Sequence, residues 1–108
     1  MGVTKTNLFT EAQNELARVA KALAHPARIA ILEHLISANA CINSDLVQEL
    51  GLAQATISQH LRELKEQGII HGNIEGVSVS YCINPEKWTQ IQKHLSQFFD
   101  AYKGGNCC

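Results

Sequence analysis

The sequence predicts an α+β domain of about five helices, with a two-stranded β-hairpin between the fourth and fifth. Two observations carry this prediction. Apolar residues recur at helical spacing in several segments that end at glycine or before proline. Residues 77–83 instead alternate strictly between two kinds of side chain, which is the period of a half-buried strand.

The first two predicted helices cover residues 8–24 and residues 26–37. The first is rich in Ala, Glu, Lys and Leu, and its apolar residues recur at helical spacing. His25 and Pro26 end it, and Pro26 suits the first turn of the second helix because that turn tolerates a missing N–H. Residues 38–42 are expected to form a connection.

Two shorter helices follow, around a glycine. Asn43 or Ser44 suits the cap of a third helix over residues 45–50, and Gly51 suits its end. A fourth helix is expected over residues 54–67, with Gly68 ending it. Its apolar face consists of Ile57, Leu61 and Leu64. The turn between these two helices makes a helix-turn-helix.

The hairpin and the last helix complete the domain. Residues 69–74 and 77–83 are predicted strands joined by a turn that contains Gly76. Asn84 and Pro85 begin a helix that runs to about residue 101. One apolar stripe follows that helix: Trp88, Ile91, Leu95, Phe98 and Phe99. Residues 1–102 are predicted to be a single winged helix-turn-helix domain, and residues 103–108 a flexible tail.

Composition indicates the class of protein but does not identify a binding partner. The chain has 108 residues, 45% of them hydrophobic, which fits one globular domain. The net charge is −1, so any argument for DNA binding has to come from local side chains. No apolar run approaches the ~20 residues that span a bilayer. We expect a cytoplasmic protein without a membrane partner.

The fourth helix has the side chains that a DNA-reading helix needs. Short polar residues and a few cations occupy its non-apolar positions, and residues 54–62 contain no acid. Such side chains pair with base edges and phosphates of double-stranded DNA in the major groove. The candidate DNA-binding residues are Gln54, Thr56, Ser58, Gln59, His60, Arg62 and Lys65. The alternatives are a merely solvated helix face, or a winged helix that contacts only proteins.

Three segments resemble the ArsR/SmtB family of metal-sensing repressors. They are ALAHPARIAIL at residues 22–32, DL at residues 45–46, and QATISQHLRELKEQG at residues 54–68, within a resemblance that covers about residues 11–95. The resemblance implies a homodimer on an inverted-repeat operator, released when an inducer binds, with no cofactor required for DNA binding. It also implies dimer contacts from the first and last helices.

The resemblance leaves the inducer open. Family members bind zinc-type ions through paired Asp, His and Glu on the last helix, where this chain offers only His94 as a nitrogen ligand. Arsenic-type members carry Cys-x-Cys before the Asp-Leu of the third helix. Here only Cys41 is present, slightly displaced. The sequence is most similar to an arsenic-type sensor with a displaced cysteine site.

Two adjacent cysteines at the end of the chain can supply the missing thiols. Soft ions prefer thiolates, and trivalent arsenic or antimony suits three sulfurs. We therefore predict that Cys41, Cys107 and Cys108 bind arsenite or antimonite; another soft metal, or thiol oxidation, is the alternative trigger. In a reducing cytosol the cysteines are expected to be thiols, and Cys82 is interpreted as packing on the hairpin.

The sequence does not predict an enzyme. It contains no Gly-rich phosphate loop and no His-Glu-x-x-His motif. A thiol enzyme would need a base beside Cys41, and the nearest histidine in sequence, His34, lies seven residues away across a helix end. No part of the sequence places the two together.

Overall fold

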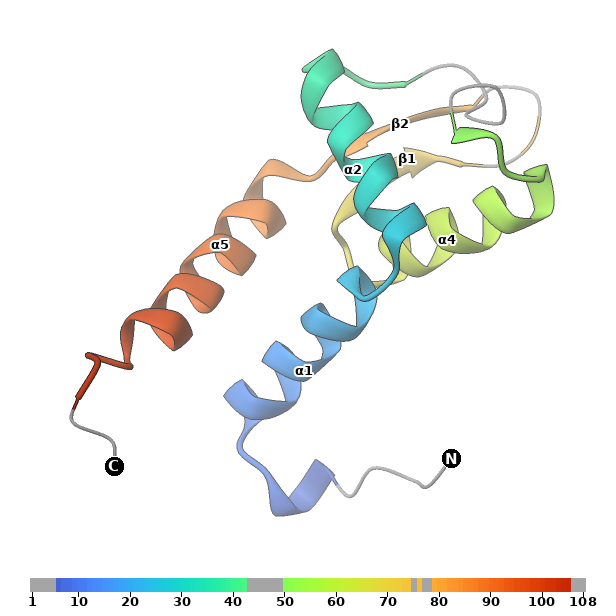
Figure 1. Cartoon of the computed structure of the whole chain (residues 1–108). Coiled ribbons are helices and arrows are strands. Elements are labelled where there is room, and N and C mark those ends of the chain that lie inside the picture. The colour runs from blue at the N-terminus through green and yellow to red at the C-terminus, as the bar shows by residue number, and fades with distance from the viewer. Residues whose placement is uncertain (1–5, 43–49, 75, 77–78, 106–108) are drawn as a thin grey trace.

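The computed structural model describes residues 6–42, 50–74, 76 and 79–105, which form four α-helices and a two-stranded antiparallel hairpin (Figure 1). A short 3-10 helix, η1, precedes them at Thr6–Leu8. The helices are α1 (Glu11–Leu23), α2 (Pro26–Ala38), α4 (Gln54–Glu66) and α5 (Pro85–Asp100). The predicted third helix, residues 45–50, lies outside the described residues apart from Leu50. The predicted winged-helix fold is confirmed in these elements.

Local capping chemistry sets where α1 and α2 begin. The hydroxyl of Thr10 accepts a hydrogen bond from the Gln13 backbone N–H, and the Gln13 side chain accepts one from the Thr10 N–H. This reciprocal capping box starts α1 three residues later than the helical periodicity predicted. His25 caps α2 through Nδ1, which accepts from the Ala27 N–H, and Pro26 occupies the first turn as predicted.

The end of α2 and the start of α5 follow the same logic. Asn39 closes α2 in the left-handed region, at φ 49°, a conformation that asparagine tolerates better than most residues. The side chain of Asn84 accepts from the N–H groups of Glu86 and Lys87, which confirms it as the cap of α5. The caps at Asn39 and Asn84 therefore give hydrogen-bond partners to backbone C=O and N–H groups that an uncapped helix end would leave unpaired.

The hairpin is shorter than its sequence pattern suggested. Strand β1 (Ile70–Asn73) pairs antiparallel with β2 (Ser80–Ile83), in a register that places Ile70 opposite Ile83. Ile42 adds an isolated bridge to Tyr81, with N···O distances of 2.7 and 3.0 Å. The connection after α2 thus lies along the free edge of β2.

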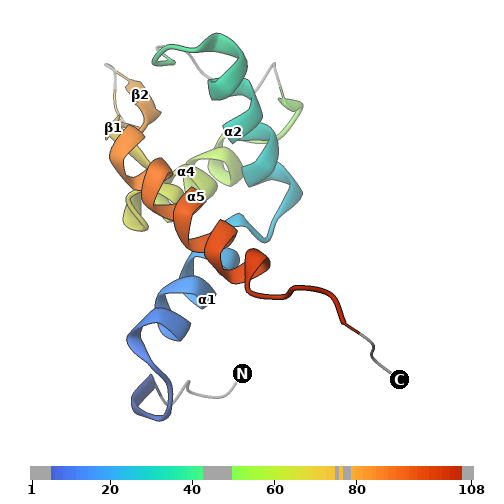
Figure 2. The ribbon, with the colours of Figure 1, turned by 90° about the vertical axis from the view of Figure 1, so that its left-hand side faces the viewer.

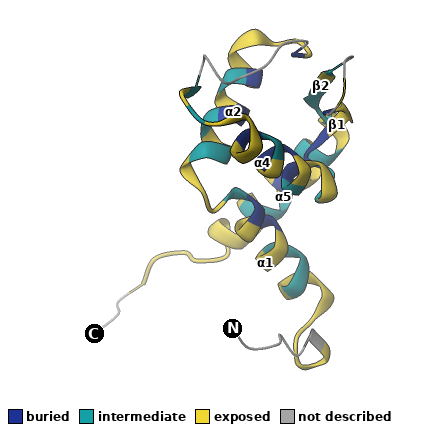
Figure 3. Cartoon of the chain, turned by 90° about the vertical axis from the view of Figure 1, so that its right-hand side faces the viewer, coloured by how far each residue is buried: buried dark blue, intermediate teal, exposed yellow. Residues whose placement is uncertain are grey.

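The core lies where α2 and α4 pack against each other and against the hairpin, as the buried residues in Figure 3 show. Its most enclosed side chains come from four elements and the turn before β1. They are Ile31, Ile57, Leu64, Ile69, Ile70 and Tyr81. The predicted apolar face of the fourth helix, Ile57, Leu61 and Leu64, is confirmed as buried.

Helices α1 and α5 extend away from this core toward the end of the molecule where both termini lie (Figures 1 and 2). The Cα radius of gyration is 16.3 Å, compared with about 13 Å for a compact domain of this length. In the part of the chain that the structure describes, no helix has both the length and the apolar content of a membrane span.

Candidate DNA interface and cysteine pair

The polar side of α4 is open to solvent along its whole length, while the opposite side is buried in the core. We call the polar side the reading face. It consists of Gln54, Thr56, Ser58, Gln59, Arg62 and Lys65, of which all are exposed except the half-buried Ser58. The burial pattern follows from helical geometry, because residues three and four positions apart share a side. The reading face therefore has the exposure that contact with a DNA groove requires.

The first turn of α4 is also open. Ala53 precedes the helix and has no side chain that can cap it, so the first N–H groups are left without a side-chain acceptor from the cap residue. Gln54 Nε2 donates to Ser58 Oγ at 3.1 Å, which orders two polar groups of the reading face. Uncapped N–H groups and ordered amides are both suited to phosphate and base contacts.

His60 does not belong to the reading face, and the prediction that it contacts DNA is corrected on this ground. It is only 7% exposed. The reason is its position in the helix: it lies three residues after Ile57 and four before Leu64, so it projects from the apolar side. Polarity alone placed His60 among the DNA contacts, and its spacing would have placed it with the core.

The buried imidazole of His60 has two specific neighbours on α2. Arg28 Nε donates to His60 Nδ1 at 3.0 Å, and the His25 ring lies tilted against it with centroids 4.3 Å apart. Burial lowers the pKa of His60 below its usual value, and the positive charges of His25 and Arg28 lower it further; Glu63 opposes them. Sequence reasoning missed Arg28, because its partner lies 32 positions away.

The structure pairs two cysteines that the sequence did not connect. Cys41 and Cys82 form a disulfide, with their Cα atoms 4.2 Å apart. This corrects two predictions: that both were thiols, and that Cys82 only packs on the hairpin. We call these two residues the cysteine pair. Cys41 is exposed and Cys82 half-buried, so the pair lies near the surface.

The strand register explains the cysteine pair. Ile42 bridges to Tyr81 in antiparallel fashion, so the residue before Ile42 lies opposite the residue after Tyr81. Because facing Cα atoms in an antiparallel pair lie about 4.5–5.5 Å apart, cysteines at those positions lie within disulfide range. The sequence does not reveal this pairing, because the pattern of residues 38–42 indicates a connection and not a strand.

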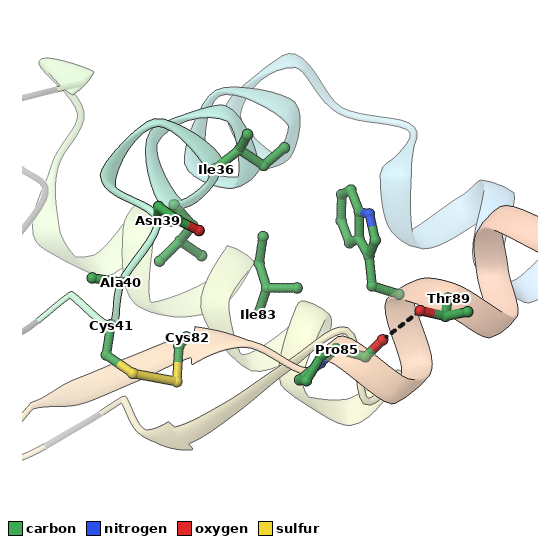
Figure 4. A pocket seen from close by; sticks show the side chains of 10 residues that line it. Ile36, Asn39, Ala40, Cys41, Cys82, Ile83, Pro85 and Thr89 are labelled. Carbon is green, nitrogen blue, oxygen red and sulfur yellow. Dashed lines mark hydrogen bonds between the residues drawn. A yellow bond between two sulfur atoms is a disulfide. The ribbon is translucent and has the colours of Figure 1, made fainter.

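The cysteine pair lies in the wall of a pocket of about 510 Å³ between the end of α2 and the start of α5 (Figure 4). Its other walls are mostly apolar and include Ile36, Ile83 and Trp88. Small reagents therefore have a route to the sulfur atoms from the surface.

The predicted three-cysteine ligand set is not assembled within the described residues. Cys107 and Cys108 lie outside them, and no three His, Cys, Asp or Glu side chains gather into a metal site in the described part. Helix α5 carries the chain about 24 Å from the hairpin. Residues 101–107 span at most about 25 Å, so a same-chain site with Cys41 requires a nearly fully extended tail.

An apolar surface remains exposed where α1 begins and α5 ends. It consists of Leu8, Phe9, Phe98, Phe99 and Tyr102, of which Phe99 is 67% exposed. Of the predicted stripe on the last helix, Ile91 is buried and Trp88 and Leu95 pack against the core. Phe98 and Phe99 instead contact each other edge to face at 5.4 Å and face outward with the rest of this α1–α5 surface.

Comparison with known proteins matches residues 25–71 to the bacterial regulatory protein, arsR family, model. The biofilm growth-associated repressor of Xylella fastidiosa (strain 9a5c) is 31% identical over 88 residues, which are 82% of this chain and 76% of that protein. The transcriptional repressor PagR of Bacillus anthracis is 34% identical over 80 residues, 74% of this chain and 80% of PagR.

A solved structure supports the same assignment. The crystal structure of the transcriptional repressor BigR from Xylella fastidiosa superposes with a TM-score of 0.61 at 27% identity, covering 94% of this chain and 99% of that one. Sequence and fold agree, and the matched region contains α2, α4 and the start of the hairpin. The chain therefore belongs to the ArsR family of bacterial regulatory proteins and is a DNA-binding transcriptional regulator, not an enzyme.

Proposed function

We propose that the protein is a homodimeric repressor that binds an inverted-repeat operator through α4 and is released when the cysteine pair reacts. One observation carries the DNA part of this proposal: all residues of the reading face except Ser58 are exposed, while the opposite side of α4 is buried in the core. We expect the hairpin that follows α4 to contact the adjacent DNA backbone. Residues 75, 77 and 78 at its tip lie outside the described residues.

The α1–α5 surface supports the homodimer. It exposes four aromatic rings at the end of the molecule that extends from the core. Exposed apolar side chains gathered at one end of a molecule favour association, and a two-fold pairing of this surface repeats α4 on both sides of the symmetry axis. Two reading helices related in this way match an inverted repeat.

The operator proposal predicts a strong effect of Arg62→Ala. If Arg62 contacts a base, removing its guanidinium is expected to weaken operator binding by about 5- to 150-fold, since a base contact contributes about 1–3 kcal/mol. If Arg62 contacts a phosphate, its removal is expected to reduce the slope of log affinity against log salt by about one. The measurement is fluorescence anisotropy on the DNA upstream of the protein's own gene, over a series of salt concentrations.

Arg18→Ala is the matched control for this measurement. Arg18 is an exposed arginine on α1 that pairs with Glu15 at 2.8 Å, away from the reading face. Its removal is expected to leave affinity unchanged, and the wild-type complex is expected to contain two chains per duplex. Equal affinities for Arg62→Ala and wild type would contradict the assignment of the reading face.

The cysteine pair is a suitable trigger because it joins the two elements that must fit DNA together. Cys41 lies at the entry to the helix-turn-helix, and Cys82 lies on β2 of the hairpin. In the proposed step, the Cys41 and Cys82 thiols lose two protons and two electrons to hydrogen peroxide; the S–S bond forms, the O–O bond breaks and two waters leave. The resulting tether restricts how the hairpin adjusts relative to α4.

Arsenite or antimonite remains the second candidate trigger, bound by Cys41, Cys107 and Cys108 from the same chain or from a partner chain. The exposure of Cys41 supports this route, because a soft ion that prefers sulfur ligands can reach it. Reduced thiols are required for this route, so it and oxidation exclude each other at Cys41.

We expect oxidation of the cysteine pair to weaken operator binding by about tenfold or more, within the usual range of allosteric coupling. The measurement titrates reduced protein with peroxide and, separately, with arsenite, and follows operator affinity and free thiols. Cys82→Ser is expected to lose the peroxide response. Cys107→Ser combined with Cys108→Ser is expected to keep it and to lose the arsenite response.

Each route has its own contrary result. A peroxide response that survives in Cys82→Ser would contradict control by the cysteine pair. An arsenite response that survives the double tail substitution at wild-type concentrations would contradict the ligand set of Cys41, Cys107 and Cys108. Neither result would affect the operator proposal, which the Arg62 measurement tests separately.

A further inference from the structure

We propose that Arg28 is a positioning residue for the reading helix: its hydrogen bond to the neutral His60 fixes how α4 is seated, so operator binding weakens when His60 takes up a proton. Arg28 lies on α2 and meets α4 on the side opposite the reading face. The inference rests on the proposed operator binding and adds a control of it that is independent of the cysteines.

The guanidinium of Arg28 connects three helices at one point. Its Nε donates to His60 Nδ1 on α4 at 3.0 Å, and its Nη1 donates to the Ala22 carbonyl at the end of α1 at 3.2 Å. A longer contact of 3.5 Å reaches the Lys21 carbonyl. The α1 carbonyls therefore hold the guanidinium, and the guanidinium in turn holds the imidazole.

The position of His60 makes this link matter for DNA reading. His60 follows Gln59 directly and lies two residues before Arg62, so it is in the middle of the reading face's length but on the opposite side of the helix. Rotation of α4 about its axis, or a tilt of its middle turn, moves the side chains of Gln59 and Arg62. Base contacts are made at hydrogen-bond distances, so such a shift lowers affinity directly.

The hydrogen bond also fixes the protonation state of His60. An arginine guanidinium has donors and no acceptor, so the Nδ1 that accepts from it carries no proton, and the neutral ring holds its proton on Nε2. A second proton can only go to Nδ1. That step removes the acceptor and places an imidazolium against the guanidinium.

The charged groups that face His60 oppose that step on balance. His25 and Arg28 on α2 face it directly and disfavour the proton, whereas the carboxylate of Glu63 on α4 favours it. On α1, Arg18 and Lys21 line the same pocket as His25, Arg28 and Glu63. Arg18 is held there by its ion pair with Glu15. The groups that act on His60 are therefore His25 and Arg28 against Glu63, and a protonated His60 is repelled from its seat.

The sign of the pH effect follows from the lowered pKa of His60. Its pKa in the fold lies below 6.5, whereas in the unfolded chain it is near that value. As pH falls from neutral, the unfolded chain takes up the proton first, and the stability of the Arg28–His60 link is lost as pH passes through the lowered value. Exposed histidines act in the opposite direction, because their added positive charge strengthens DNA binding.

The experiment measures operator affinity from about pH 7.5 to about pH 5.5 at constant salt, a range that spans the ordinary histidine pKa. The operator affinity of the wild type is expected to fall about tenfold or more at the acid end of this range, which is the usual size of allosteric coupling. His60→Asn keeps an oxygen acceptor near the Nδ1 position and does not titrate. It is expected to bind as wild type at neutral pH and to lose the acid-induced decrease.

Arg28→Ala is expected to weaken operator binding about tenfold at neutral pH, by the same coupling range. Arg18→Ala is the matched control, because Arg18 is an arginine beside the same pocket whose ion-pair partner is Glu15. Arg18 is not among the charged groups that act on His60, so this control should change neither affinity nor the pH profile. Circular dichroism at each pH identifies any loss of folding in the variants.

NMR titration of the imidazole resonances gives a readout that does not depend on DNA. His60 in wild type is expected to titrate below the ordinary histidine pKa, and at higher pH in Arg28→Ala than in wild type. An acid-induced decrease in binding that persists in His60→Asn, or an unchanged His60 titration in Arg28→Ala, would overturn the proposal. A wild type that fails to bind operator would overturn the proposed function alone, since the NMR titration still decides the Arg28–His60 link.

Discussion

Replacing Gly72 with alanine is expected to lower the free energy of unfolding by about 2–4 kcal/mol, because it combines backbone strain with steric overlap. Gly72 adopts φ +115°, which side-chain-bearing residues rarely reach. A Cβ at this position would overlap the carbonyl oxygen of Ser80 and lie 2.9 Å from the Cα of Tyr81. The two strands would have to separate where Gly72 and Tyr81 face each other.

Substitutions at two other glycines separate the effect of backbone strain from that of steric overlap. Gly76 also has a positive φ, +88°, but a Cβ added there would meet nothing within 4 Å, so Gly76→Ala measures strain without overlap. Gly105 has open space and no positive φ, and Gly105→Ala should be neutral. Chemical denaturation of the three variants gives the comparison. A Gly72→Ala protein as stable as Gly105→Ala would contradict the hairpin geometry.

Replacing Ile31 with alanine is expected to cost about 2–5 kcal/mol of unfolding free energy, the usual range for truncating a fully buried isoleucine. Ile31 is 0% exposed and lies on α2, the helix that packs against both α4 and the hairpin strand β2. The loss combines removed apolar burial with the cavity left behind. The total free energy of unfolding of a domain of this size is only about 5–15 kcal/mol, so the variant should melt at a markedly lower temperature.

Ile29→Ala is the matched control, with the same substitution in the same helix. Ile29 is 41% exposed, so its truncation removes less buried surface and leaves no closed cavity. Thermal and denaturant unfolding of both variants should show a loss several times larger at Ile31. Similar losses at the two positions would contradict the placement of the core.

The elements that the sequence predicted best are those with a local chemical signal. Pro26 and Asn84 are features of helix starts, and the structure has α2 and α5 begin beside them. The start of α1 was predicted three residues too early, because periodicity continues through Leu8 while the capping box at Thr10 decides where the backbone turns helical. Helix existence follows from periodicity, and helix ends follow from caps.

The features that the sequence did not predict are those that depend on contacts between distant segments. Cys82 joins Cys41 only because Ile42 pairs with Tyr81, and that pairing has no sign in either local pattern. Arg28 finds His60 only after α2 and α4 pack. Side-chain chemistry suggested a DNA contact for His60, yet the helical repeat that correctly buried Ile57 and Leu64 also buries it.

The cysteine bridge has a thermodynamic consequence beyond its position beside the pocket. It spans a sequence separation of 41 and so closes a covalent ring that contains all of α4 and β1. Closing a ring of that size removes unfolded-chain entropy equivalent to about 4 kcal/mol. Oxidation therefore holds the DNA-reading segment together even if α1 or α5, both outside the ring, loosens. Under the proposed oxidative release, a molecule that has left DNA is preserved against unfolding until its thiols are regenerated.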